Sequence, residues 1–151
     1  MGGALLPALG LEVRSTVDID LVGCGKKEMG QTLEIMKIAE DLGLPIDTIN
    51  QAATYFLNKV GYKKNDLILL YKGRKAKIYR PSLELYWKLK LNRLSETDAK
   101  DCYHYFNYCL ENNDLFDKRK FLKRLNLLIE SESSRDKSIR LLQLKKQLLE
   151  K

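Results

Sequence analysis

The sequence is poor in the residues that metal sites and disulfide frameworks need. Its 151 residues include a single histidine, His104, and three cysteines. An odd number of cysteines cannot form a complete disulfide framework, and the spacing of Cys24, Cys102 and Cys109 matches no zinc finger. We therefore expect no metal site and a reducing, intracellular compartment, either cytoplasmic (nucleoid) or nuclear.

Long apolar runs are absent as well. No stretch approaches the eighteen consecutive apolar residues of a membrane-spanning helix. The apolar run over 2–11 lacks the basic start and the long apolar centre of a signal peptide. The sequence thus predicts a protein without membrane contact.

Catalytic motifs are also missing. No pair of carboxylates stands out as a general acid and base, and Cys24 has no base nearby in the sequence. The glycine-rich run 23–27 fails as a phosphate-binding loop, because that motif needs glycine where Asp20 stands and serine or threonine where Lys27 stands. We expect no enzyme, no catalytic residue and no cofactor.

What the sequence does contain is a pair of amphipathic helices joined by a glycine turn. Gly43 ends the first predicted helix, over 28–42, and Pro45 suits the first position of a second helix over 45–60, which Gly61 ends. The apolar stripe of the first helix consists of Leu33, Ile35, Met36, Ile38, Ala39 and Leu42. The apolar face of the second consists of Ile49, Ala52, Ala53, Phe56 and Val60.

The other face of the second helix carries short polar side chains without negative charge. Asparagine and glutamine can pair with adenine in a major groove, and threonine can touch a thymine methyl group. An ordinary solvent-exposed face is the alternative interpretation of any one of them. The candidate base-reading residues are Thr48, Asn50, Gln51 and Thr54.

A predicted β-hairpin follows, because two β-branched and aromatic runs over 67–71 and 76–80 flank a Gly73 turn. The formal charge is −4 over 1–58, +9 over 59–93 and +2 over 94–151, so the excess is concentrated around this hairpin. A concentrated basic segment is typical of a phosphate-backbone binder, although a solvated lysine-rich face gives the same count. The candidate phosphate contacts are Lys72, Arg74, Lys75, Lys77 and Arg80.

The stretch from Ile38 to Arg80 resembles the winged helix-turn-helix of transcriptional regulators. The resemblance lies in Leu42-Gly43-Leu44, the Thr48-Ile49 pair and the Gly73-Arg74 wing. It implies that the helix around 48–54 reads bases of double-stranded DNA and that the wing contacts the backbone. The additional preceding helix of that family has no convincing counterpart in 1–27.

Two alternatives remain open beside this interpretation. Leu42-Gly43-Leu44-Pro45, with Ala52-Ala53 and Phe56, also resembles the cyclin-box repeat of transcription initiation factor B, which implies a transcription factor or an adaptor docking on RNA polymerase or another regulator. Tyrosines interleaved with the cations would instead allow base stacking of single strands, if their rings are exposed. These tyrosines are Tyr62, Tyr71, Tyr79 and Tyr86.

Helical patterns resume beyond the hairpin, with predicted helices over about 82–92, 95–110, 117–130 and 135–151. Ser82 marks the start of the first, and Ser95 with Asp98 three positions later marks the start of the second. One face of the second helix carries Cys102, Tyr105, Phe106 and Cys109. The last one carries two leucine-rich stripes, so docking on its own domain and pairing with a second copy are both open. The expected fold is mainly α (α+β), a winged helix-turn-helix with a β-hairpin wing and a C-terminal helical extension. Its expected parts are an irregular arm over 1–27, a nucleic-acid-binding domain over 28–93, and an extension over 94–151 that includes the candidate homodimer helix.

Overall fold

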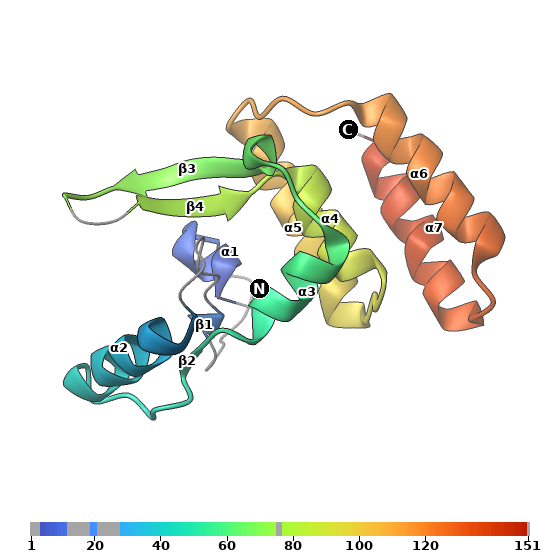
Figure 1. The fold of residues 1–151 in the computed structure, drawn as a ribbon. Helices are drawn as coiled ribbons and strands as arrows, with labels where there is room; N and C mark the ends of the chain where they lie inside the picture. The colour runs from blue at the N-terminus through green and yellow to red at the C-terminus, as the bar shows by residue number, and fades with distance from the viewer. Residues whose placement is uncertain (1–3, 12–18, 21–27, 75–76, 151) are drawn as a thin grey trace. The chain divides into compact units, whose positions relative to one another are not determined.

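A computed structural model describes residues 4–11, 19–20, 28–74 and 77–150. The described part is mainly helical and contains a small antiparallel sheet, which confirms the mainly α, α+β class (Figure 1). The chain divides into two compact units, Met1–Tyr62 and Lys63–Lys151, and this boundary falls inside the domain expected over 28–93. The helix expected to read bases and the hairpin expected to contact phosphates therefore belong to different units.

The described residues of the N-terminal arm, 4–11 and 19–20, include one helical turn and one short strand. One helical turn, α1 (Leu5–Ala8), occurs there, and it buries Leu6. Strand β1 (Ile19–Asp20) lies within the alternating run and pairs in parallel with β2 (Ile49–Asn50). The remainder of the arm, 12–18 and 21–27, lies outside the described residues, and so does Cys24.

Helix α2 (Glu28–Asp41) confirms the predicted first helix, and its end is built as the sequence indicates. Gly43 adopts φ +66°, which suits a residue without Cβ. The Leu44 N–H donates to the Ala39 carbonyl and the Gly43 N–H to the Glu40 carbonyl, each at 2.9 Å, which is the Schellman arrangement. Ala39 is fully buried, whereas four large side chains of the predicted stripe are exposed: Leu33, Met36, Ile38 and Leu42.

The second helix is shorter than predicted. Helix α3 (Ala52–Val60) begins seven positions after Pro45, because Thr48 closes a turn onto the Pro45 carbonyl at 3.0 Å and Ile49 enters the β1–β2 pair. Ile49 is β-branched and buried, and its pairing with Ile19 takes it out of the helix that the periodicity predicts. The predicted apolar face is also wrong at Phe56, which is 59% exposed, while Leu57 is 3% exposed. Gly61 ends the helix at φ +68°, as expected.

Two serine caps start the central helices of the second unit. The hydroxyl of Ser82 accepts from the Leu85 N–H at 3.3 Å and begins α4 (Leu83–Leu91). Ser95 and Asp98 form a reciprocal capping box at the start of α5 (Glu96–Glu111). Both starts confirm the sequence prediction.

The core of this unit is aromatic. The Trp87 indole N–H donates to the Cys102 carbonyl at 3.3 Å, and its ring meets Phe121 edge-on with centroids 5.1 Å apart. The predicted inward face of α5 is confirmed as buried: Cys102, Tyr105, Phe106 and Cys109. Helix α6 (Lys118–Ser131) packs with α7 (Arg135–Leu149), and α7 also packs with α5. Both helices confirm the predicted segments to within two residues.

The predicted hairpin is present, as β3 (Leu67–Lys72) and β4 (Lys77–Pro81). A single 3₁₀ turn, Lys64–Asp66, leads into it, and the Asp66 carboxylate accepts from the Lys63 N–H at 2.8 Å. Helix α4 follows β4 directly and contacts it, so the hairpin is continuous with the core of the second unit.

Candidate nucleic-acid interface

The pairing register decides which hairpin side chains share a face. Leu69 pairs with Tyr79 and Tyr71 with Ile78, so Leu70 is the extra residue of a bulge. Because Ile78 and Tyr79 are consecutive, they point to opposite faces of β4. The bulge therefore places Tyr71 on one face of the hairpin and Tyr79 on the other.

Two lysines lie directly opposite each other at the open end of the hairpin. Lys72 pairs with Lys77, and both side chains are exposed. Directly opposite residues bring their Cβ atoms to about 4.5–5.5 Å, where like charges destabilise the pair. Within the described residues neither lysine has an ion pair with an acidic partner. An anion between the two ammonium groups would relieve the repulsion.

The turn adds further charge to this end. Arg74 is exposed and has no ion pair within the described part of the chain. Lys75, also a predicted phosphate contact, lies outside the described residues. The described cationic end of the hairpin thus consists of Lys72, Arg74 and Lys77.

Arg80, the fifth predicted phosphate contact, is a core residue. Its side chain is buried, and its guanidinium forms two hydrogen bonds of 2.7 Å with the Asp114 carboxylate. It also donates to the Tyr105 hydroxyl at 3.1 Å and lies over the Tyr108 ring. These partners occupy the guanidinium and leave it no route to a phosphate. The sequence could not show this, because Asp114 is 34 residues away.

The predicted base-reading residues are not on one helix. Thr48, Asn50 and Gln51 all precede α3, and Thr54 lies within it, half-buried. The expected polar helix face is therefore wrong for the first three. Thr48 lies in the turn, Asn50 in β2, and Gln51 at the N-cap of the helix.

The tyrosines divide between surface and core. Tyr71 and Tyr79 are exposed beside Lys72 and Lys77, whereas Tyr86 is buried against Tyr105 with ring centroids 4.4 Å apart. Stacking on bases requires an exposed ring next to cations. Tyr79 meets that condition on the face that carries the paired lysines, and Tyr86 does not.

A second cationic group escaped the sequence interpretation. Five of the seven residues over 118–124 are basic and none is acidic. Counting charge over the whole of 94–151 hid this cluster, since acidic residues elsewhere offset it. A shorter counting window would have found it.

The most strongly perturbed carboxylate belongs to a buried ion network. Lys90 donates to Asp98 at 2.9 Å and to Asp101 at 3.0 Å, and Arg93 adds bonds of 2.7 and 2.8 Å to Asp98. Burial alone would raise the pKa of Asp98, but the hydrogen bonds from Arg93 and Lys90 outweigh it and hold the pKa well below 3.8. Lys90 lies on α4 and both aspartates lie on α5, so this buried network joins the two helices.

The described residues contain neither a candidate metal site nor a candidate membrane-spanning helix. Among them, no group of three or more histidine, cysteine, aspartate or glutamate side chains is arranged to hold a metal ion. Nor does any of their helices combine the length and apolar character needed to cross a bilayer.

The chain was also compared with known proteins. No family model, no curated protein and no solved structure matches it. The resemblances to winged-helix regulators and to cyclin-box repeats therefore remain predictions.

Proposed function

We propose that the protein binds double-stranded DNA and acts in transcription, with the cationic end of the hairpin contacting the phosphate backbone. The observation that carries this proposal is the directly opposed pair Lys72 and Lys77, with Arg74 in the adjoining turn. Like charges directly opposite each other destabilise a strand pair, and a bound polyanion would relieve that repulsion between Lys72 and Lys77. A phosphate backbone supplies regularly spaced negative charge at the right density.

Base reading is the finer part of the proposal. Thr54 would act from α3, while Thr48, Asn50 and Gln51 would act from the segment that precedes it. Phosphate contacts position a protein but carry no sequence information, so any sequence preference must come from such residues. The hairpin alone supports binding without preference.

A salt titration tests the hairpin contact. Binding of the full chain to a labelled random duplex is measured by fluorescence anisotropy across a salt series, and Lys72, Arg74 and Lys77 are then replaced together by alanine. Each lost phosphate contact should lower the slope of log K against log salt by about 0.9. We expect the triple variant to bind more weakly and to lose most of its salt dependence.

A control variant with the same change in net charge shows whether the position of the cations matters, and not only their number. Lys100, Arg135 and Lys146 lie on α5 and α7, are all exposed, and are replaced together by alanine. We expect this control to keep nearly the full slope. Equal losses in both variants would contradict the hairpin assignment.

The second candidate function is a protein adaptor docking on RNA polymerase or another regulator. The observation that favours it is the basic segment of α6, which lines an apolar hollow rather than a flat charged face. Failure of the wild-type chain to bind random duplex even at low salt would favour the adaptor over the DNA binder.

A further inference from the structure

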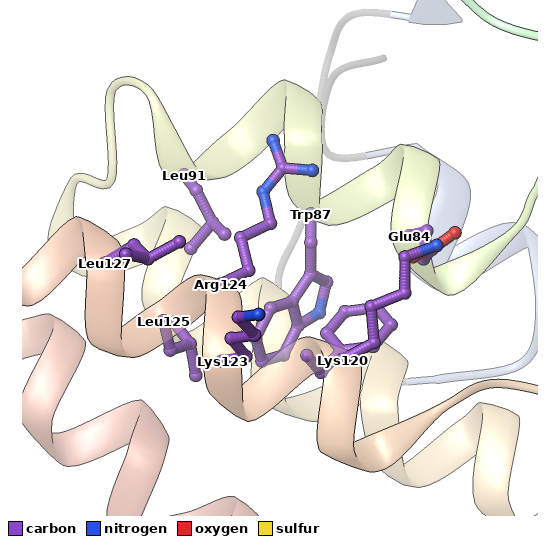
Figure 2. Close-up of a pocket in the computed structure, with 9 residues that line it drawn as sticks. Glu84, Trp87, Leu91, Lys120, Lys123, Arg124, Leu125 and Leu127 are labelled. Carbon is purple, nitrogen blue, oxygen red and sulfur yellow. The ribbon is translucent and has the colours of Figure 1, made fainter.

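An open groove with a cavity of about 210 Å³ lies between helices α4 and α6 of the second unit (Figure 2). Its floor is apolar and buried, formed by Trp87 and Leu91 of α4 and by Phe121 and Leu125 of α6. Leu127, 57% exposed, adds an apolar side chain at the rim. Small-molecule sites usually measure about 300–1,000 Å³, so this cavity better suits one large apolar side chain than a cofactor.

The rim of the same cavity is positive. Lys120, Lys123 and Arg124 line it, and Glu84 is the sole acidic residue among the lining residues. Glu84 is already paired with Lys120 at 3.0 Å. Within the described part of the chain, the side chains of Lys123 and Arg124 form no ion pair and no hydrogen bond. Two uncompensated positive charges therefore flank an apolar cavity.

We propose that this groove binds an acidic peptide segment that inserts one large apolar side chain between α4 and α6. The apolar cavity would hold the anchor, and Lys123 and Arg124 at its rim would attract acidic residues near that anchor. Recognition of an amphipathic segment in a groove between helices uses the same combination of an apolar anchor and charged flanks. The proposal is independent of DNA binding by the hairpin.

Nucleic acid fits the groove less well than an acidic peptide does. Trp87 is 1% exposed, so its ring offers no open face on which a base could stack. Phosphates would use the rim cations but would leave the apolar cavity unfilled. A ligand with both negative charge and an aliphatic or aromatic side chain uses both features.

Trp87 makes the groove directly observable, because it is the single tryptophan of the chain. The probe is a tryptophan-free synthetic peptide of about 15 residues, long enough to form a helix, with glutamates on its polar face and one phenylalanine anchor. Titrating the full chain with this peptide should change the Trp87 emission in a saturable way. Replacing the phenylalanine by alanine should weaken binding about tenfold or more, as for a buried anchor residue.

Matched charge reversals locate the site. Lys123→Glu with Arg124→Glu should weaken binding of the peptide about tenfold or more, because both charges adjoin the bound segment. The control, Lys118→Glu with Arg119→Glu, makes the same charge change on α6 at residues that do not line the cavity. At 0.15 M salt, screening over about 8 Å should keep the control within about threefold of the wild type. Circular dichroism confirms that both variants remain helical.

Several outcomes would overturn the proposal. Peptide binding that is indifferent to the anchor would indicate charge attraction alone, and equal losses in the two double variants would mean that the groove is not the site. No change in Trp87 emission with the folded wild-type chain would equally exclude it. Displacement of the peptide by a duplex oligonucleotide that itself depends on Lys123 and Arg124 would assign the groove to nucleic acid. The hairpin triple variant should bind the peptide normally, which separates this test from that of the proposed function.

Discussion

The guanidinium of Arg80 and the carboxylate of Asp114 form two parallel hydrogen bonds of 2.7 Å, which fasten the base of the hairpin to the loop after α5. Tyr105 extends the link, since its hydroxyl accepts from Arg80 and donates to the Pro81 carbonyl. The exposed end of the hairpin carries the cations proposed for DNA, and the buried end carries this network. Of the two hairpin arginines, Arg80 of β4 is therefore structural, whereas Arg74 of the turn is the one proposed to contact phosphate.

Substituting the two hairpin arginines by lysine should separate these roles. Arg80→Lys keeps the charge but loses the paired geometry with Asp114, so the free energy of unfolding should fall by about 2 kcal/mol. Arg74→Lys alters an exposed turn residue and should change stability by less than about 0.5 kcal/mol. Urea unfolding followed by circular dichroism gives both values. Equal stability of the two variants would argue against a structural role for Arg80.

Acid should destabilise the protein through Asp98 and Asp114. Hydrogen bonds from their cationic partners hold the pKa of each carboxyl below 3.8 in the folded state. A lowered folded-state pKa contributes stability above the unfolded pKa of about 3.9, and that stability is lost as pH falls through the folded value. The unfolding free energy should therefore be level between about pH 5 and 7 as far as these groups are concerned, and should decline below about pH 4.

Asp114→Asn is the variant that checks this pH dependence. It removes one titrating carboxyl while keeping a side chain of similar size beside Arg80. We expect lower stability at neutral pH and a shallower decline below about pH 4, because fewer protons are taken up on unfolding. A decline as steep as that of the wild type would exclude Asp114 as a contributor.

The sequence was most informative where local rules decide structure. Ser95 with Asp98 three positions later predicted the start of α5, and Gly43 and Gly61 predicted helix ends. Prediction failed where a distant partner decides. The sequence predicted a helix start at Pro45, but Ile49 pairs with Ile19, thirty positions earlier, and the helix begins only after that strand.

The candidate site shows the same division. Exposed cations at the hairpin end followed from the turn residues alone, whereas the burial of Arg80 depends on Asp114 and Tyr105. The groove between α4 and α6 depends on tertiary packing of Trp87 against Phe121, which no sequence spacing encodes. The sequence showed which segment is rich in cations, but tertiary packing determines which of those cations are exposed and which are buried in ion pairs.

The two exposed hairpin tyrosines distinguish double-stranded from single-stranded ligands. Tyr79 shares a face with Lys72 and Lys77, and Tyr71 lies on the other face. If duplex DNA is the ligand, Tyr79→Leu should leave the affinity nearly unchanged, since phosphate contacts dominate. Base stacking would instead make this substitution cost about 1–3 kcal/mol on an oligothymidine strand, with Tyr71→Leu as the control. Anisotropy titrations of each variant with the duplex and with the oligothymidine strand distinguish the two kinds of ligand.

Pairing of two copies through 135–151 remains a prediction. In the structure, only one apolar stripe of α7 is exposed and could form such a contact. Leu141, Leu144 and Leu148 are buried within the chain, which leaves the second stripe, Ile139, Leu142 and Leu149, exposed. These three fit heptad positions, but Lys146 occupies the position between Leu142 and Leu149, and a lysine there weakens a helical pair. We therefore expect any dimer to be weak. Sedimentation equilibrium of the wild type and of Leu142→Glu tests this, because a charge in the stripe should leave only monomer without lowering the urea midpoint. A dimer that survives Leu142→Glu would place the contact elsewhere.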